Sequence, residues 1–379
     1  MPNTVVLDVL IVYNGATAAS ASDDSANVPF LPSSQNVPCN DAYAYMLSYC
    51  DSLGLTAGFA TSTDIIGPGR CSSYWTIQNK QWIKVMRPVY ATQIFDKFSP
   101  KNIKDTKTRV KLFSSSNISP YNSKEIFEMF FDKQNTYDSH PSCAIPTLSL
   151  SETSLSHVKA QCLQLALLTK LSNSSDYTRE IIMKDRHGAG GWHVYKIAPY
   201  SYKKILSIMQ KNPTISFIIQ PFTLFDAKDI RLIYIGGKLL QSYFRQAKSG
   251  DFRCNEHQGG TSTYIKLSTI PKDILTKSNF IVSSLNHANT LFALDFIVGT
   301  SGRIHFIEGN TGPGLSWNKH NVKEVFMGKQ LIRAIVQNLA SRLEIQSSQK
   351  SITPHQFLSL PKTSRYGDVF SPPKIINAS

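Results

Sequence analysis

The sequence lacks the signatures of several large protein classes. None of its six cysteines lies in a Cys-x-x-Cys pair, which argues against a structural zinc site and a disulfide framework and favours a reducing compartment. No apolar stretch approaches the about 20 residues of a membrane-spanning helix, since Asp295 interrupts the run that starts at Leu291. The N-terminus has neither the basic region nor the long apolar core of a signal peptide. We therefore expect a cytoplasmic protein.

Long runs of lysine and arginine are also missing, although the chain carries a net charge of +14. This charge favours an anionic partner, which is a nucleic acid, a membrane surface or an anionic small molecule, or else it reflects a solvated basic surface. Without a basic run, a tail that binds nucleic acid is not indicated. The sequence also has no G-x-S-x-G motif and no Cys–His signature, so nucleophilic catalysis is not indicated either.

The composition that is present fits a folded protein of two to three domains. The chain has 379 residues, of which 41% are hydrophobic and 11% aromatic. Residues 5–13 read as a buried first strand before an Asn14-Gly15 turn, and Asn40 is expected to cap a helix that runs to about Leu53. Residues 99–121 look like a linker, which places the first domain boundary near residue 120.

After this boundary, helices and strands alternate. A helix is expected from Asn122, with Glu125 as its capping-box partner, and residues 154–171 have helical spacing of their apolar side chains. A long amphipathic helix is expected over 321–343, before a polar tail that starts at about Ser347. The predicted strands are 56–61, 81–86, 180–185, 192–197, 216–220, 230–235, 239–245, 291–298 and 303–308, and Gly236-Gly237 forms a hairpin turn between two of them.

A lysine followed by a glycine-rich loop is the first motif that could carry chemistry. Lys184 lies near the end of one predicted strand, Gly188, Gly190 and Gly191 fall in the loop, and Trp192 starts the next strand. Glycines let backbone N–H groups approach an anion closely, and lysine adds a positive charge. The motif is not a Walker loop, because no Gly-Lys-Ser/Thr closes it. Taken alone, it fits a flexible hairpin loop better than a phosphate site.

Acidic and amide side chains form the second motif. Asp295, Glu308 and Asn310 lie on or at the ends of two apolar strands, where an acid is costly to bury unless it is paired or bound to a metal. Two carboxylates and an amide oxygen are hard donors that suit magnesium. The alternative is a pair of structural acids at the ends of a sheet. The glycines and proline of residues 309–314 favour a functional site, because they fix an unusual backbone path directly after the acids.

The third motif is a polar segment in which two arginines, Arg245 and Arg253, bracket a turn. Arginine suits phosphate because its planar guanidinium donates several hydrogen bonds. A solvated loop accounts equally well for this segment when it is taken alone.

Together and in this order, these motifs resemble the ATP-grasp superfamily, and most of all its RimK-like and glutathione-synthetase-like ligases. The segments that carry the resemblance are residues 229–238, Arg245, and residues 251–260, 294–296 and 306–314. The likeness is strong over about 180–318, extends back to about 125 and is weak over 1–120. Each motif is common by itself, whereas several motifs in register are specific.

The resemblance implies an α+β, three-lobed ATP-grasp fold in which two lobes with antiparallel sheets clasp ATP. It places an N-terminal α/β domain at 1–120, a central lobe with the glycine-rich lid loop at 121–221, a C-terminal lobe with the magnesium site at 222–345, and a polar tail at 346–379.

Site residues follow from the same resemblance, position by position. The residues that would bind ATP are Lys133, Lys184, Gly188, Gly190, Gly191, Gln220, Pro221, Phe222, Asp229, Arg253 and Asn255. Asp295, Glu308 and Asn310 would bind one or two Mg²⁺ ions, with Mn²⁺ as the other candidate ion. Arg253 and Arg245 would be catalytic: the first stabilises the transferred phosphoryl group, and the second holds the substrate carboxylate or the acyl phosphate.

The implied reaction joins a carboxylate to an amine. The carboxylate attacks the γ-phosphate of ATP to give an acyl phosphate and ADP, and the amine of an amino acid, a peptide or a protein terminus then displaces phosphate. Neither a membrane nor a nucleic acid is implied as a partner, and a homo-oligomer is in keeping with the family. Two alternatives remain: an ATP-grasp kinase that acts on an anionic small molecule, which suits the charge of +14, and a non-catalytic nucleotide-binding protein. Trp192, His193, Cys254 and Glu256 depart from the family pattern and leave the substrates open.

Overall fold

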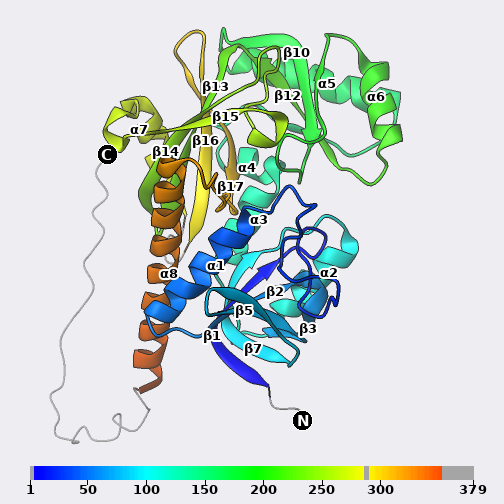
Figure 1. The fold of residues 1–379 in the computed structure, drawn as a ribbon. Coiled ribbons are helices and arrows are strands. Elements are labelled where there is room, and N and C mark those ends of the chain that lie inside the picture. The colour runs from blue at the N-terminus through cyan, green and yellow to red at the C-terminus, as the bar shows by residue number, and fades with distance from the viewer. Residues whose placement is uncertain (1–3, 286–289, 352–379) are drawn as a thin grey trace, which may run out of the picture.

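The computed structural model describes residues 4–285 and 290–351, with side chains up to residue 345, and its strands form three sheets (Figure 1). The first sheet and its helices occupy the N-terminal third of the chain. Their elements are β1 (Val5–Tyr13), α1 (Cys39–Ser52), β2 (Ala57–Thr61), β3 (Ile65–Gly67), β4 (Arg70–Cys71), β5 (Tyr74–Gln78), β6 (Gln81–Val85), β7 (Val89–Lys97), α2 (Ile103–Leu112) and β8 (Ser119–Pro120).

In this sheet the strand order is β3-β4-β7-β1-β2-β5-β6, with β8 paired to β7. The predicted first strand is confirmed as β1, which runs parallel to both neighbours, β2 and β7, and is therefore apolar along most of its length. The expected linker over 99–121 is wrong. The segment contains helix α2, which Asn102 caps, and strand β8, which completes the sheet.

The start of helix α1 also differs from the prediction. The helix begins at Cys39 with Pro38 before it, and Asn40 does not cap it. The Asn40 side chain instead donates to the Phe30 carbonyl oxygen (2.7 Å) and accepts from the Phe30 N–H (3.1 Å). It thus fixes the loop that precedes the helix, a long-range role that local capping rules do not anticipate.

The second sheet has the antiparallel order β11-β10-β12-β9. The elements of this part of the chain are α3 (Lys124–Phe131), α4 (Lys133–Ser139), β9 (Leu148–Leu150), α5 (Leu155–Leu171), β10 (Tyr177–Asp185), β11 (Val194–Ile197), α6 (Tyr202–Lys211) and β12 (Phe217–Thr223). Helices α5 and α6 pack on this sheet, and the predicted apolar spacing of α5 is confirmed because Val158, Cys162 and Leu165 are buried against it.

Helix α3 begins two residues later than predicted. Ser123 is its cap, and the side chain of Asn122 instead reaches the C-terminal sheet, where it accepts from the Leu291 N–H (2.7 Å) and donates to the Leu291 carbonyl oxygen (3.0 Å). Helices α3 and α4 pack on strand β17 of that sheet, although they lie in the range predicted for the central lobe. The domain boundaries at 120, 221 and 345 stay a prediction.

The third sheet has the order β15-β14-β13-β16-β17. Its elements are β13 (Phe225–Ile235), β14 (Lys238–Gln246), β15 (Thr261–Ile265), α7 (Lys272–Ser283), β16 (Leu291–Gly299), β17 (Ile304–Asn310) and α8 (Val322–Ser351). The predicted hairpin is confirmed: Ile235 pairs with Lys238, and both glycines between them have positive φ. Helix α8 is longer than the expected 321–343, and α7 was not predicted.

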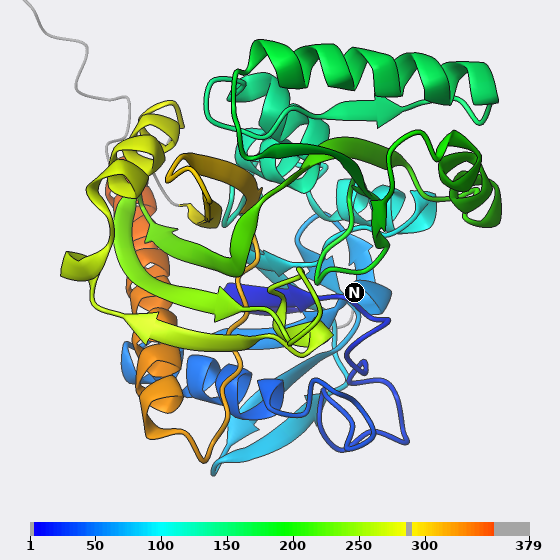
Figure 2. The same cartoon turned by 90° about the horizontal axis from the view of Figure 1, so that it is seen from above.

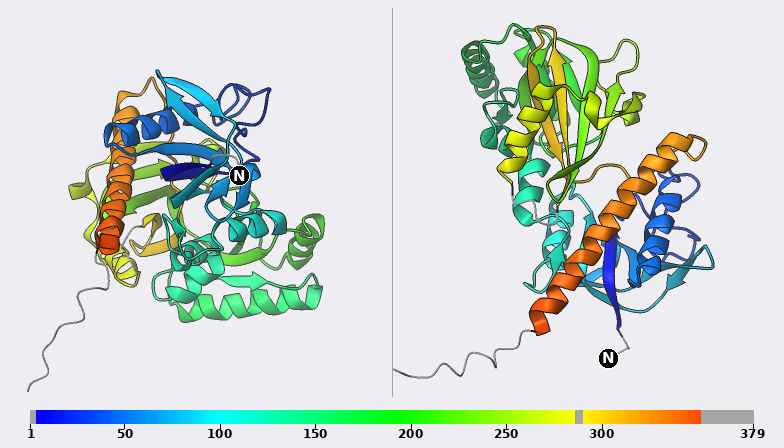
Figure 3. Two further views of the ribbon diagram at one scale, coloured as in Figure 1. Left: turned by 90° about the horizontal axis from the view of Figure 1, so that it is seen from below. Right: turned by 90° about the vertical axis from the view of Figure 1, so that its left-hand side faces the viewer.

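The two faces of β13 have different environments, and this difference positions the site. Ile230 and Leu232 enter the apolar core beneath α7. On the other face, Ile233 joins a core shared with α1 and α8, whereas Asp229 and Arg231 precede it on the strand and point to the same side. Helices α1 and α8 lie side by side and join the N-terminal sheet to this face (Figures 2 and 3). Within the described residues, no helix is long and apolar enough to cross a membrane.

Candidate functional site

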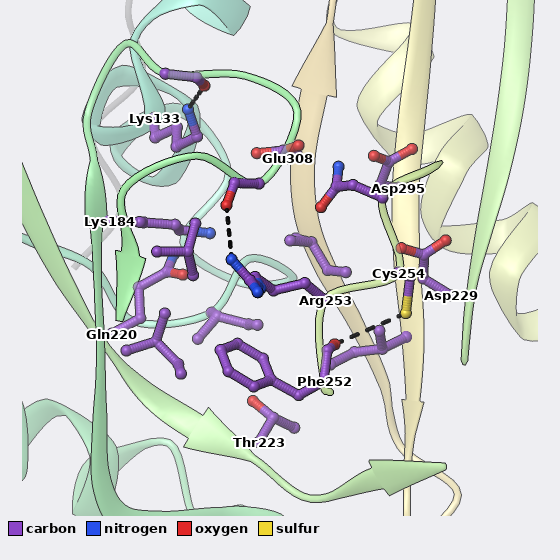
Figure 4. A pocket seen from close by; sticks show the side chains of 18 of the residues that line it. Lys133, Lys184, Gln220, Thr223, Asp229, Phe252, Arg253, Cys254, Asp295 and Glu308 are labelled. Atoms are coloured by element: carbon purple, nitrogen blue, oxygen red, sulfur yellow. Dashed lines mark hydrogen bonds between the residues drawn. The ribbon is translucent and has the colours of Figure 1, made fainter. Parts of the chain in front are cut away.

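A cavity lies between the second and third sheets and brings most of the predicted site together (Figure 4). All of the predicted ATP-binding residues line it, as do Arg245, Asp295 and Glu308. Among the predicted site residues, Asn310 alone does not line the cavity. Its side-chain oxygen accepts a hydrogen bond from the Gly312 N–H (2.9 Å) and so shapes the loop that follows β17.

Two lysines lie on the side of the cavity that the second sheet and α4 form. Lys184, on β10, is buried, and burial lowers the pKa of its ammonium group to about 8 despite the nearby Glu308 carboxylate. Lys133, the first residue of α4, donates to the Gly188 carbonyl oxygen of the glycine loop. A phosphate group at this place would therefore meet two lysine charges and the loop backbone.

The glycine loop between β10 and β11 contacts the third sheet's loop over 251–258. Gly190 and Gly191 both have φ near +70°, and their carbonyl oxygens accept hydrogen bonds from Gln258 (3.1 Å) and Arg253 (3.4 Å), respectively. A Cβ atom at Gly191 would lie 2.8 Å from the Asn255 side-chain oxygen. Glycine is thus required here for conformation and for space, and the loop covers the cavity.

The opposite end of the cavity is more apolar. Gln220 and Phe222 lie on β12; the Gln220 amide donates to the Thr147 hydroxyl (2.7 Å). The Phe222 ring lies between the Lys196 ammonium, 3.7 Å from its centroid, and the Phe252 ring, 5.8 Å away. This end provides flat apolar surface and buried polar groups, which suit a heteroaromatic base.

Four charged side chains form a buried network across β13, β14 and β16. Arg245 donates to both oxygens of Asp229 (2.7 and 2.8 Å) and to Asp295 (2.7 Å), and Arg231 donates to both oxygens of Asp295 (2.7 and 2.6 Å). Burial raises the pKa of Asp229 to about 6, even though Arg245 opposes the shift. The pKa of Asp295 is lowered, because its two arginine partners outweigh the effect of burial.

Glu308 differs from this network. It is directly opposite Asp295 in the pairing of β16 and β17, so both side chains lie on the same face of the sheet and line the cavity. Among the described residues, no hydrogen bond or ion pair engages its carboxylate, and no group of three or more His, Cys, Asp or Glu side chains is arranged to hold a metal ion. A cation here would meet the Glu308 carboxylate first and would share Asp295 with the arginines.

Arg253 is paired with an acid of its own loop. Its guanidinium donates to Asp251 (2.7 Å), and these hydrogen bonds lower the pKa of Asp251 to about 2. The remaining Arg253 nitrogen, Nη1, donates to the Gly191 carbonyl oxygen of the glycine loop (3.4 Å). In the view of Figure 4, Arg253 and Glu308 lie between the two lysines on one side and Asp229 and Asp295 on the other.

Comparison with known proteins accounts for this arrangement. Residues 147–335, about half of the chain, match the family model of the RimK-like ATP-grasp domain. The chain belongs to the ATP-grasp superfamily. The predicted α+β, three-lobed fold is confirmed by the three sheets and by the solved structures described below. The cavity described above lies between the two sheets of the ATP-grasp domain.

Curated relatives cover part of the chain. A probable alpha-L-glutamate ligase of Maridesulfovibrio salexigens is 27% identical over 184 residues, which are 45% of this chain and 58% of the relative. A probable alpha-L-glutamate ligase 1 of Shewanella denitrificans is 36% identical over 87 residues, 23% of this chain and 28% of the relative. The chain thus spans less than two thirds of the length of these relatives.

Solved structures are similar over most of the chain. D-cycloserine synthetase matches with a TM-score of 0.55 and 11% identity, over 88% of this chain and 99% of the other. A RiPP-associated ATP-grasp ligase of Chryseobacterium gregarium, solved with ADP and a leader and core peptide, matches with a TM-score of 0.54 and 12% identity, over 89% and 97%. At these identities, the likeness concerns the fold.

Two residues that support the site from outside the cavity were not predicted from the sequence. Arg231 holds Asp295, and the signal for it was available, because Asp229 and Arg231 are two apart on one strand and so share a face. Lys97, at the end of β7, donates to the Pro313 carbonyl oxygen (2.8 Å) and links the N-terminal sheet to the loop after β17. No local pattern marks a contact between residues more than 200 positions apart.

Proposed function

We propose that this chain is an ATP-dependent carboxylate–amine ligase that forms an amide bond through an acyl phosphate and releases ADP and phosphate. The observation that carries the proposal is the position of Glu308 in the ATP-grasp cavity. Its unpaired carboxylate lies beside the Lys184 charge and opposite Asp295, so a metal-bound nucleotide would find both signs of charge there. The names of the two curated relatives as probable glutamate ligases support the same class of reaction.

Each group has a role in this proposal. Lys133 and Lys184 bind the phosphates, and the flat apolar end near Phe222 takes the adenine. Glu308 and Asp295 supply the hard oxygens that a Mg²⁺ ion prefers, and this ion neutralises phosphoryl charge. Arg253 holds the terminal phosphate once it leaves Asp251 for the more highly charged ligand.

The proposed reaction also requires that water be excluded from the cavity, because an acyl phosphate hydrolyses readily. The glycine loop supports this role, since Gly190 and Gly191 already hydrogen-bond to the loop over 251–258 across the cavity. Arg245 contributes differently from the expectation. Its guanidinium is already paired with Asp229 and Asp295. We therefore propose that Arg245 orients these two carboxylates and does not bind the substrate.

The experiment is the release of ADP from Mg-ATP in the presence of pooled amino acids and small dicarboxylates, with the product masses measured in parallel. A ligase requires the pool, and its product gains the mass of the amine less one water. The variant Glu308→Ala should lose this turnover. The matched variant Glu152→Ala, an exposed acid outside the cavity, should retain it.

Two other outcomes of this experiment would identify a different function. Transfer of the γ-phosphate to a hydroxyl group identifies a kinase. Binding of ATP without pool-dependent ADP release, unchanged in Glu308→Ala, identifies a nucleotide-binding protein.

A further inference from the structure

A second cavity, of about 790 Å³, lies between helices α2 and α3. This volume is within the range of sites that enclose small organic ligands. Its walls come from α2, from the segment over 113–121 and from α3, and helix α8 contributes Arg342. Among the described residues, none lines both this cavity and the ATP-grasp cavity, so the two are separate.

The walls of this cavity are largely apolar and aromatic. Phe113 and Phe127 face it on either side of Arg109, whose guanidinium carbon lies 5.0 and 3.6 Å from the two ring centroids. Val110 also lines the cavity and has 64% of its surface exposed. Aromatic walls that face open space favour a ligand with an apolar body, since its binding would remove this surface from water.

Positive charge accompanies the apolar walls. Arg342 is only 7% exposed, and its hydrogen bonds go to uncharged groups: the Ser119 hydroxyl (2.8 Å) and the carbonyl oxygens of Pro120 (3.0 Å) and Tyr121 (3.5 Å). Within the described part of the chain, no carboxylate lies within ion-pair distance of it. A buried cation without an acidic partner is costly, so the protein gains if an anion enters beside it.

Two donors remain for such an anion. Neither Nε of Arg342 nor Nη1 of Arg109 has a hydrogen-bond partner among the described residues, although Arg109 uses its other nitrogens to bind Asp96 (2.9 and 2.6 Å). Unsatisfied polar groups at the wall of a cavity are the usual sign of a missing polar ligand.

We propose that this cavity binds a small organic anion, with a carboxylate or phosphate head at Arg342 and Arg109 and an apolar, ring-sized body against the apolar wall that includes Val110 and Phe131. The site does not depend on the proposed ligase activity. Phe127 also lines a smaller cavity that contains Lys97 and Gly312, next to the loop that follows β17. The anion is either the acid substrate of the proposed ligase or a separate ligand, and the variants below distinguish these two sources.

The test uses the full chain and 2-naphthoate as the probe, with neutral 2-naphthamide for comparison and saturating Mg-ADP to occupy the ATP cavity. Calorimetry should show that the acid binds at least about ten-fold more tightly than the amide, because charge-assisted hydrogen bonds are made only by the acid. Arg342→Gln should weaken acid binding about ten-fold. Arg333→Gln, on the exposed face of the same helix, should leave it unchanged.

A second pair of variants keeps the arginines intact. Val110→Trp places a larger side chain at the cavity and should abolish binding, whereas Ile103→Trp, exposed on the same helix but outside the cavity, should not. Equal affinity for acid and amide, loss of the probe on addition of Mg-ADP, or full binding by Val110→Trp would overturn the proposal. Turnover of Val110→Trp then separates the two sources: lost turnover identifies the acid substrate, and normal turnover identifies a separate ligand.

Discussion

Asp295 and Glu308 are direct cross-strand partners on β16 and β17, yet arginines hold only Asp295. Arg231 and Arg245 occupy both of its oxygens, whereas the Glu308 carboxylate faces the cavity near Lys184. The two acids therefore have different tasks. Asp295 anchors the charge network of the sheet, and Glu308 is the acid that a bound cation reaches first.

Removal of Arg231 should destabilise the protein strongly. Arg231→Met leaves the fully buried Asp295 with Arg245 as its remaining partner, and we expect a loss of about 3 kcal/mol in the free energy of unfolding. Urea denaturation measures this loss. The exposed Arg87→Met should change stability by less than about 0.5 kcal/mol.

The double variant Arg231→Met/Asp295→Leu checks the cause. It should recover part of the lost stability, because no buried charge is then left unpaired. A double variant less stable than the single one would show that the arginine acts by packing and not by pairing with Asp295.

Nucleotide affinity should depend on pH through Lys184. Its pKa in the folded protein is about 8, lowered by burial, and only the protonated form carries the charge that attracts phosphate. We expect the affinity for Mg-ATP to be level below pH 8 and to fall by up to about ten-fold for each pH unit above it. Titrations between pH 7 and 9.5 measure this dependence.

Lys184→Arg provides the decisive comparison, because arginine stays charged over this range. Its affinity should lose the break near pH 8. Lys97, whose pKa burial also lowers to about 8, does not line the ATP cavity, so Lys97→Arg should keep the break. If the break near pH 8 disappeared in Lys97→Arg and stayed in Lys184→Arg, the titrating group would be Lys97 and the assignment to Lys184 would be wrong.

Strain in the lid loop can be separated from its function. Gly191 and Gly236 both have positive φ, so alanine at either position should cost about 1 kcal/mol of stability. At Gly191 the added methyl group would also collide with Asn255, whereas at Gly236 it would make only an ordinary contact, 3.7 Å from the Asn338 side-chain nitrogen. We therefore expect Gly191→Ala, and not Gly236→Ala, to weaken nucleotide binding. Equal nucleotide affinities in the two variants would show that the glycine loop does not contribute to nucleotide binding.

A buried hydrogen bond joins Asp176, the residue before β10, to His305 on β17 of the third sheet. His305 is 2.9 Å from Asp176, and the Ser301 N–H and hydroxyl also bond to this carboxylate. Burial alone would raise the pKa of Asp176, but these hydrogen bonds lower it to about 2. Because this pKa is depressed on folding, its contribution to stability is complete above about pH 4 and is lost as the pH falls toward 2.

Asp176→Asn should accordingly cost about 2 kcal/mol at pH 7, and this difference from the natural protein should shrink as unfolding is measured nearer pH 3. The exposed Asp226→Asn should show no difference at either pH. A cost that is the same at pH 7 and pH 3 would mean that the carboxylate charge is not what stabilises this contact.

The sequence predicted the parts of the fold that local patterns encode. The apolar run of β1 and the two glycines of the β13–β14 hairpin are examples, because burial and turn geometry act over a few residues. Asn40 and Asn122 show the limit. Capping rules predict that such residues start helices, but both side chains bond to distant backbone instead, which no local rule detects.

The candidate site shows the same division. Family motifs located Lys184 and Glu308, which line the cavity as expected, although their roles stay predictions. They did not indicate that Arg231 and Arg245 hold Asp295, because that pairing depends on the register of three strands. Nor did they indicate Arg342, which α8 brings to the cavity between α2 and α3.

The central claim is that a carboxylate oxygen attacks the γ-phosphate of a nucleotide held at Lys184 and Glu308. The most direct measurement uses amino acids and dicarboxylates labelled with ¹⁸O in their carboxylates and follows the label during turnover with Mg-ATP. An acyl phosphate transfers one labelled oxygen to the released phosphate, so the account predicts ¹⁸O in that phosphate. Turnover that yields unlabelled phosphate, or a product that retains the γ-phosphate on a hydroxyl group, would contradict it.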